Sequence, residues 1–350
     1  MVRGMWDIWT AYRMRLRRRY FLYRGLRKRH QLRPRCNRSK QIAPGAILAF
    51  TTLRNERVRL EYFLNYYRQL GVDHFLMVDN ASTDGSAEYL AEQPDVSLWT
   101  TPKSYKKSRF GVDWLTWLQI RYGHKHWCLT VDADEILVYP HCDSRDLRQL
   151  TGWLDQRAIP SFGTIMLDMY PKGALNEQSY HAGQNPFEIL RWFDASNFRS
   201  QMQPHLQNLW VQGGVRDRVF FSDRPERAPT LNKTPLVKWN RRFAYVMSTH
   251  SLLPRRLNHV FGPQATTGAL LHSKFLPMIS EKSAEEKQRR EHFANSSLYD
   301  SYYERLTQSP DLWCENSVEY KDWRQLEALG LMSRGLWDGA SPKPPGLIFT

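Results

Sequence analysis

The sequence predicts an α/β fold: a mostly parallel central sheet with helices on both faces, preceded by an N-terminal helix. Short apolar runs alternate with amphipathic segments between residues 46 and 131, which is the pattern of buried parallel strands connected by helices. Glycine or proline follows several of these segments, as at Gly71 and Pro94. A chain of 350 residues is also long enough to bury the core of such a domain.

The first half of the chain carries the clearest signals. Four short apolar runs are expected to be strands, at residues 46–52, 74–79, 96–99 and 127–131. Helices are expected between them, from an Asn55 cap to Gly71, from residue 82 to Pro94, and over residues 109–122. Later segments are expected to be helices at 144–156 and 280–294, a strand at 163–168, and long loops over a site at 171–235.

The first 40 residues form a basic arm. They hold 14 of the 50 Lys and Arg residues but only one of the 35 Asp and Glu residues, Asp7. Six apolar side chains at spacings of three and four predict a helix with one stripe: Met5, Trp9, Tyr12, Leu16, Tyr20 and Tyr23. Pro34 should end this helix, and residues 34–44 should be a linker. We expect residues 1–33 either to lie on an anionic membrane surface or to pack on the domain or on a second subunit.

Charge and cysteine content narrow the class of protein. Outside the arm, basic and acidic residues nearly balance, which argues against nucleic acid as a partner. No run of about 18 apolar residues is present to span a membrane. The four cysteines form no C-x-x-C pair, which favours a cytoplasmic location, with the arm on the inner face of the cell membrane. The glycine motifs of dinucleotide dehydrogenases and P-loop hydrolases are absent from the sequence.

Two acidic motifs follow predicted strands. In residues 78–86, Asp79 ends a strand, and Ser, Thr and Gly open the next helix. Such a carboxylate can accept a hydrogen bond from a base or a ribose beside free helix N–H groups, although a turn and helix cap would use the same residues. Asp132 and Asp134 follow the fourth predicted strand, and because they are two positions apart their side chains should point to the same side. They would suit a divalent cation that binds phosphate, and an exposed acidic loop is the alternative.

Taken together, three motifs resemble the family 2 glycosyltransferases. They are Thr-Leu-Arg-Asn-Glu at 52–56, Val-Asp-Asn-Ala-Ser-Thr-Asp-Gly-Ser at 78–86 and Val-Asp-Ala-Asp-Glu at 131–135. The resemblance covers residues 45–140 and implies the A-type glycosyltransferase fold. Three later segments resemble a bacterial subgroup of that family: residues 213–218, 231–238 and 270–275.

The resemblance implies roles for residues of the nucleotide-binding half. Asn55 and Glu56 would meet the nucleotide where the first strand ends. Asp79 would hold the base, and Asp84 would support the loop that carries it. Asp132 would contact the ribose or the sugar.

The same resemblance implies a metal cofactor, Mn²⁺ or Mg²⁺, that bridges the diphosphate of the donor. Asp134 would bind this ion, with Asp132 beside it and His272 completing the site. Three basic side chains are expected to contact the diphosphate: Lys103, Arg109 and Lys274.

The leading hypothesis is a metal-dependent, inverting glycosyltransferase. It would move a sugar from a nucleotide-diphospho sugar to a glycan or lipid-linked acceptor, as in the synthesis of cell-surface polysaccharides. A carboxylate would deprotonate the acceptor hydroxyl. Asp217, which follows two glycines and is flanked by Arg216 and Arg218, is the first candidate for this base. Asp168, at the end of an apolar run, is the second.

Two other functions remain open. A nucleotidyltransferase on a similar sheet normally carries a Gly-rich basic loop after the first strand, which residues 51–56 lack. A catalytically inactive binding protein, tethered to a membrane or to nucleic acid, is the third hypothesis.

The expected domain organisation is an arm and linker at 1–40, a catalytic domain at 41–300 and a C-terminal extension at 301–350. Within the catalytic domain, residues 41–140 would bind the nucleotide and 141–300 the acceptor.

Overall fold

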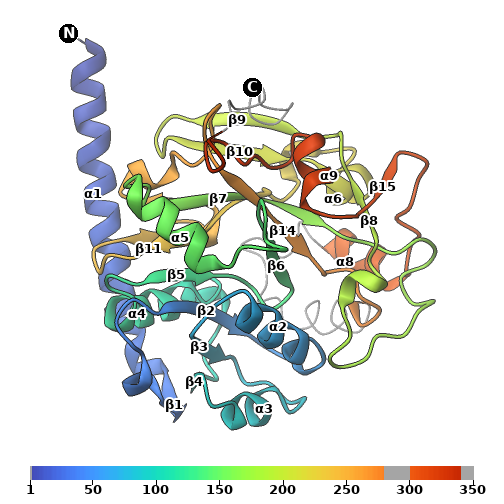
Figure 1. Cartoon of the computed structure of the whole chain (residues 1–350), viewed down its shortest axis with the longest axis horizontal. Helices are drawn as coiled ribbons and strands as arrows, with labels where there is room; N and C mark the ends of the chain where they lie inside the picture. The colour runs from blue at the N-terminus through green and yellow to red at the C-terminus, as the bar shows by residue number, and fades with distance from the viewer. Residues whose placement is uncertain (1, 280–299, 340–350) are drawn as a thin grey trace.

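The computed structural model describes residues 2–279 and 300–339, which are arranged around one nine-stranded sheet (Figure 1). In chain order, its strands are β1 (Arg33–Cys36), β2 (Ile47–Leu53), β3 (His74–Asp79), β4 (Val96–Thr100), β5 (Trp127–Thr130), β6 (Glu135–Val138), β7 (Ser161–Asp168), β11 (Asn232–Lys238) and β14 (Thr267–His272). Across the sheet the order is β1-β4-β3-β2-β5-β11-β7-β14-β6.

Most strands of this sheet point the same way. β2 is parallel to both β3 and β5, β4 is parallel to β3, and β14 is parallel to β7. Because β11 is antiparallel to both β5 and β7, β7 and β14 share the direction of β2 to β5. The edge strands β1 and β6 are antiparallel to their neighbours. The predicted α/β class with a mostly parallel sheet is therefore confirmed.

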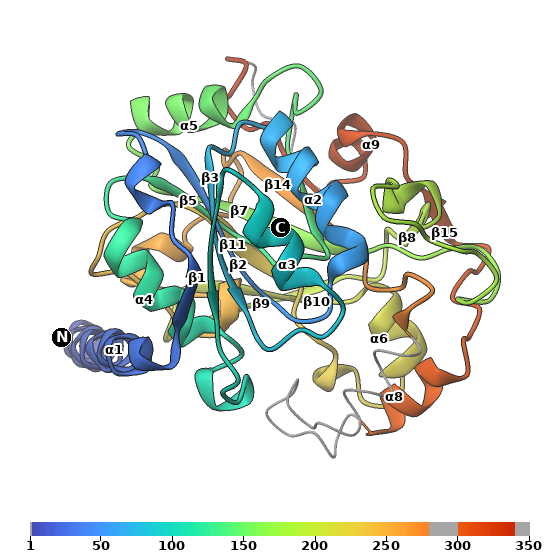
Figure 2. The same ribbon diagram turned by 90° about the horizontal axis from the view of Figure 1, so that it is seen from below.

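Helices cover both faces of the sheet because successive side chains of its strands point to opposite sides. The helices are α1 (Val2–Lys28), α2 (Arg57–Gln69), α3 (Ser86–Glu92), α4 (Val112–Tyr122), α5 (Leu147–Gln156), α6 (Gly214–Phe220), α8 (Asp300–Thr307) and α9 (Trp323–Ala328). Ala49 of β2 shares a core with Phe63 of α2, whereas its neighbour Leu48 shares the opposite core with Leu118 of α4. Figure 2 shows α2 and α3 on one side of the strands and α1 and α4 on the other.

The predicted strands and helices of the first half lie close to their expected places. The third predicted helix begins three residues late, at Val112 of α4, because Arg109 and Phe110 have positive φ angles. Residues 171–235, expected to be loops, contain α6, part of β11 and three short strands, β8 (Trp192–Asp194), β9 (Arg199–Gln203) and β10 (Asn208–Gln212). The helix predicted at 280–294 lies outside the described residues.

The segment after the N-terminal helix is not a free linker. Arg33–Cys36 forms β1, which pairs with β4 at the edge of the sheet. The two predicted halves of the catalytic domain share the sheet, because β11 of the second half lies between β5 and β7. The described part of the C-terminal extension also joins this body: β15 (Ser317–Glu319) pairs with β8, and Trp323 and Leu326 of α9 are buried in the main core.

The N-terminal helix is fixed to the body along one face. Its Arg24 donates to the fully buried carboxylate of Asp113 in α4, at 2.7 and 3.0 Å, and Arg109 donates to the same carboxylate at 2.7 Å. At Gly25 the helices approach so closely that a Cβ would lie 2.8 Å from the Cγ2 atom of Thr116. Among residues 2–279 and 300–339, no helix has the length and apolar content needed to cross a membrane.

Replacing Asp113 by Asn should loosen this attachment, because two arginines would lose their charged acceptor. We expect the free energy of unfolding to fall by about 1.5–3 kcal/mol, measured by urea denaturation. Glu88→Gln is the matched control, since Glu88 pairs with Arg35 on the surface and its replacement should change nothing measurable. Equal stability of the Asp113 variant and the wild type would contradict the proposed anchoring.

Candidate functional site

Most of the residues predicted to form a site lie at one edge of the sheet. Asp79 ends β3, and the loops after the neighbouring parallel strands β2 and β5 carry Asn55 and Asp134. Farther along the same edge, the ends of β7 and β14 place Asp168 opposite His272 in the pairing register. Ligands of open α/β sheets bind beyond the carboxyl ends of such strands.

Asp79 is buried at the end of β3 and keeps one carboxylate oxygen unused. Its Oδ2 accepts from the backbone N–H of Ser82 at 3.2 Å, while its Oδ1 has no hydrogen-bond partner in the described part of the chain. Burial raises the pKa of Asp79. A buried acceptor without a partner is costly, so this oxygen is suited to accept from a ligand.

Asn55 and Asp84 join the loops after β2 and β3. The side-chain oxygen of Asn55 accepts from the N–H of Thr83 at 2.8 Å, and the backbone N–H of Asn55 donates to Ser82 Oγ at 2.9 Å. Asp84 accepts from the N–H groups of Arg57 and Ser86. Burial acts to raise the pKa of Asp84, but the hydrogen bond from the Ser86 hydroxyl, together with those from the N–H groups, outweighs it and lowers the pKa. Asp84 therefore holds the start of α2 against the start of α3.

Arg59, at the start of α2, connects these loops to the second acidic motif. It is buried, donates to Glu56 Oε2 at 2.6 Å and to the carbonyl of Ser273 at 3.0 Å. Ser273 in turn donates its N–H to the carbonyl of Asp134 at 2.7 Å. One continuous series of contacts therefore runs from the loop after β2 to Asp134.

His272 bridges two carboxylates at the centre of the site. Its Nε2 lies 3.0 Å from Asp134 Oδ2, and its Nδ1 lies 2.6 Å from Asp168 Oδ1. The second oxygen of Asp168 accepts from Arg216 Nε at 2.7 Å. Burial opposes the charged form of His272, but the two carboxylates outweigh it and raise the pKa of the imidazole.

The two acids of this bridge are kept ionised. Burial would raise the pKa of Asp134, but His272, Arg59 and Lys274 together lower it well below its ordinary value. For Asp168 the same burial effect is overcome by Arg216 and His272, which lower its pKa to about 2. Both carboxylates are therefore charged at neutral pH.

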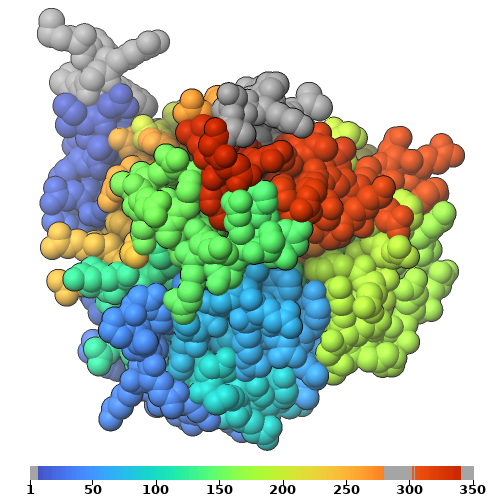
Figure 3. Space-filling model, in the orientation of Figure 1, coloured from blue at the N-terminus to red at the C-terminus, as the bar shows by residue number. Residues whose placement is uncertain are grey.

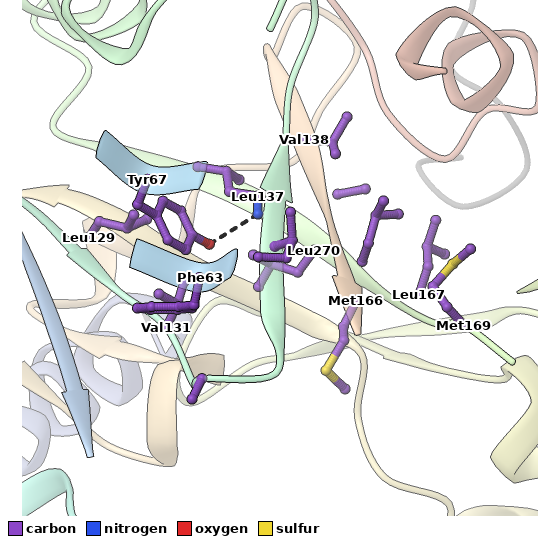
Figure 4. Packing of buried hydrophobic residues seen from close by; sticks show 14 of the residues in the cluster. Phe63, Tyr67, Leu129, Val131, Leu137, Val138, Met166, Leu167, Met169 and Leu270 are labelled. Carbon is purple, nitrogen blue, oxygen red and sulfur yellow. Dashed lines mark hydrogen bonds between the residues drawn. The ribbon is translucent and has the colours of Figure 1, made fainter. Parts of the chain in front are cut away.

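A second ion pair lies beneath the acidic motif. Lys233 of β11 pairs with the buried Glu135 and lies 3.3 Å from Asp132 Oδ2. Burial would lower the pKa of Lys233, but Glu135 and Asp132 outweigh it and raise the pKa, so the ammonium group remains charged. The adjoining strand β6 is held by Tyr67 of α2, whose hydroxyl accepts from the N–H of Leu137 at 3.0 Å (Figure 4).

The donors at Asp134 and His272 fit part of a divalent metal site. The 3.0 Å between His272 Nε2 and Asp134 Oδ2 is a hydrogen-bond distance, and two adjacent ligands of one cation, each at about 2.1 Å, would also lie about 3.0 Å apart. Asp168 holds the other ring nitrogen, as carboxylates commonly do behind metal-binding histidines. The predicted third ligand, Asp132, is 52% exposed and near Lys233, and within the described ranges no three His, Cys, Asp or Glu side chains converge on one point.

The predicted diphosphate-binding residues have different surroundings. Lys274 is half-buried, and its pKa is lowered first by burial and then by Arg216, while Asp134 and Asp168 act against this shift. Lys103 is exposed beside the Asp79 loop, where its carbonyl accepts from Asn80 at 2.9 Å.

The structure corrects the role expected for Arg109. Its guanidinium pairs with Asp113, donates to the carbonyl of Tyr245 at 3.0 Å and lies 4.0 Å from the ring centroid of Phe21. These contacts fasten α1 to α4. Arg109 is therefore a structural residue and not the predicted diphosphate ligand.

The structure also corrects the reasoning about the catalytic base. Asp217 accepts two hydrogen bonds from Arg199, at 2.8 and 2.9 Å, whereas its sequence neighbour Arg216 binds Asp168. Asp168 is almost fully buried behind His272, with both oxygens in use. Because its oxygens are used by Arg216 and His272, Asp168 is suited to orient the His272 ring.

Sequence reasoning missed Arg59 and Lys233. Arg59 stands four residues before Phe63, on the face of α2 that is buried, and this spacing was the available signal. Lys233 lies in a strand within the segment expected to be loops, so nothing local marked it as buried.

Comparison with known proteins gives only distant likenesses. No family model and no curated protein matches the chain. One similar solved structure is a 4-diphosphocytidyl-2C-methyl-D-erythritol synthase, with 15% identity, a TM-score of 0.24 and coverage of 39% of this chain and 67% of that chain. Another is described as a glucose-1-phosphate thymidylyltransferase from Bacillus anthracis, with 9% identity, a TM-score of 0.28 and coverage of 74% and 84%. At these TM-scores the likenesses carry no argument about function, which must rest on the residues of the site.

Replacing Lys233 by Met should strongly destabilise the protein, because Glu135 would remain buried without its countercharge. We expect a loss of roughly 3–5 kcal/mol in the free energy of unfolding, measured by urea denaturation. The double variant K233M/E135Q should recover part of this loss, since the buried charge is then removed as well. A double variant as unstable as the sum of its two single variants would rule out the pairing.

Proposed function

We propose that this protein is a metal-dependent glycosyltransferase that uses a nucleotide-diphospho sugar and transfers the sugar to a glycan or lipid-linked acceptor. The observation that carries the proposal is the series of contacts at one edge of the sheet, from Asp79 through Ser82 to Asn55 and then from Glu56 through Arg59 and Ser273 to Asp134 and His272. The order of the three motifs, which resembles family 2 glycosyltransferases, supports the same activity.

In this proposal the loops after β2 and β3 bind the nucleoside. The unused Oδ1 of Asp79 accepts a hydrogen bond from the base, and Asn55, Glu56 and Asp84 hold the loop shape. Asp132, half exposed at the same edge, meets the ribose or the sugar. Lys274 and Lys103 are the cations that we assign to the diphosphate.

Asp134 and His272 would hold Mn²⁺ or Mg²⁺, with Asp132 as the nearest further oxygen donor. The ion would supply positive charge to the departing diphosphate. Asp168 fixes the orientation of the His272 ring through the 2.6 Å hydrogen bond to Nδ1. This leaves Nε2 beside Asp134 Oδ2, at 3.0 Å.

The direct experiment is a thermal-stability panel of UDP-, GDP-, CMP- and dTDP-sugars with and without Mn²⁺. The proposal predicts that one nucleotide class raises the melting temperature and that Mn²⁺ increases the effect. An assay of pyrophosphate release from a nucleoside triphosphate and a sugar phosphate tests the nucleotidyltransferase alternative. Donor binding without any hydrolysis or transfer would indicate an inactive binding protein.

Asp134→Asn should lower sugar transfer or donor hydrolysis by about 10²-fold or more, the scale for losing one electrostatic stabiliser of the transition state. The reason is that the amide keeps the shape of the side chain but removes its charge beside His272. Activity is measured across a Mn²⁺ titration, with Asp143→Asn as control, because Asp143 pairs with Arg324 at the surface. Wild-type activity in the Asp134 variant, or in excess chelator, would refute the metal-dependent mechanism.

Asp168→Asn should weaken Mn²⁺ binding by about tenfold, since the residue orients His272 from behind, and added Mn²⁺ should restore much of the activity.

Asp217→Asn should transfer sugar at nearly the wild-type rate, because the Asp217 carboxylate is paired with Arg199. Donor binding and transfer are measured separately for both variants. Normal donor binding with lost transfer in the Asp217 variant would make Asp217 the base after all.

A further inference from the structure

The N-terminal helix α1 has two opposite faces with different roles. One face packs on the body: Phe21 is buried against Leu206, Ala244, Val246 and Leu253, with Met14 beside it. The other face remains open in the part of the chain that the structure describes. Figure 3 shows the coloured part of the helix as a column along one side of the molecule, and its ribbon in Figure 1 extends beyond the body at its N-terminal end.

The open face carries a stripe of large apolar side chains. Trp9, Tyr12 and Tyr23 are 62%, 51% and 60% exposed, and Leu16 and Tyr20 continue the row between them. At about 3.6 residues per turn, these five positions fall on one line along the helix, opposite to Phe21 and Gly25. Aromatic rings exposed in such a row are unusual on a surface that faces only water.

Arginines border this stripe on both sides. By the same helical geometry, Arg13 and Arg17 flank one side and Arg15 and Arg19 the other, and all four are exposed. Residues 2–28 hold nine basic side chains and one acidic, Asp7. A second copy of this helix would repel the first through these charges, whereas an anionic surface would complement them.

We propose that the open face of α1 is a docking surface for an anionic lipid bilayer. The helix would lie in the plane of the interface, with Trp9, Tyr12, Tyr20 and Tyr23 at the level of the headgroups and the flanking arginines on lipid phosphates. The opposite face, through Arg24 and Phe21, would transmit this attachment to the body. The inference is independent of the reaction that the site performs.

Vesicle co-sedimentation of the full chain tests the proposal. The probes are vesicles of phosphatidylcholine alone and of phosphatidylcholine with phosphatidylglycerol. The full chain should sediment with the anionic vesicles and much less with the neutral ones. Raising the salt from about 0.05 to about 0.5 M should weaken binding, because it screens the arginines.

Two variants separate the roles of the rings and the charges. W9A/Y12A/Y20A/Y23A keeps helix-forming residues and should bind anionic vesicles at least about tenfold more weakly. R13E/R15E should lose most binding at low salt. The matched controls are M202A, an exposed apolar residue on β9, and R157E/R224E, two exposed arginines away from α1. Thermal melting checks that every variant remains folded.

The proposal fails if the wild type does not bind anionic vesicles at low salt, or if folded W9A/Y12A/Y20A/Y23A binds them as strongly as the wild type does. Light scattering after size-exclusion chromatography tests the alternative that a second copy of the chain covers the stripe. A wild-type dimer that W9A/Y12A/Y20A/Y23A converts to a monomer, without vesicle binding by either, would assign the stripe to a second copy of the chain and overturn the lipid assignment.

Discussion

The arrangement of the site depends on one imidazole held between two carboxylates. His272 contacts Asp134 through Nε2 and Asp168 through Nδ1. The three residues come from the loop after β5 and from the ends of β14 and β7, so this bridge fixes the position of the acidic loop relative to the far half of the sheet. Because Asp168 is also bound by Arg216, the imidazole has little freedom to turn away from Asp134.

Basic side chains lie between the acidic side chains at this edge of the sheet and offset the repulsion between them. Arg59 neutralises Glu56 from one side, and Lys233 neutralises Glu135 from beneath. Each of these cations is itself buried, which is favourable only while its partner is present. The pairs therefore maintain the loop shape and leave the exposed side of the edge for a ligand.

The sequence predicted the features that depend on local pattern. The alternation of strands and helices predicted the sheet, and the acidic motifs predicted the edge along which Asp79 and Asp134 lie. His272 was predicted to lie there from the family resemblance. Partners far apart in the chain could not be predicted: Lys233 looked like a loop residue, and Asp217 was interpreted through its sequence neighbours. In the structure Asp217 of α6 pairs instead with Arg199 of β9, because β9 pairs with β10, the strand that comes just before α6 in the chain. The arm showed the converse, since its apolar stripe was visible in the sequence but its exposure was not.

In the proposed function, Asp134 and His272 hold one divalent cation together with the nucleotide. Electron paramagnetic resonance of Mn²⁺ measures this directly, because bound Mn²⁺ loses the sharp signal of the free ion. UDP, GDP, CDP and dTDP are added in turn to the wild type and to His272→Gln. We expect one bound Mn²⁺ per chain in the presence of one of these nucleotides, and loss of that binding in the variant. Equal Mn²⁺ binding by the two proteins, or none by the wild type with any nucleotide, would contradict it.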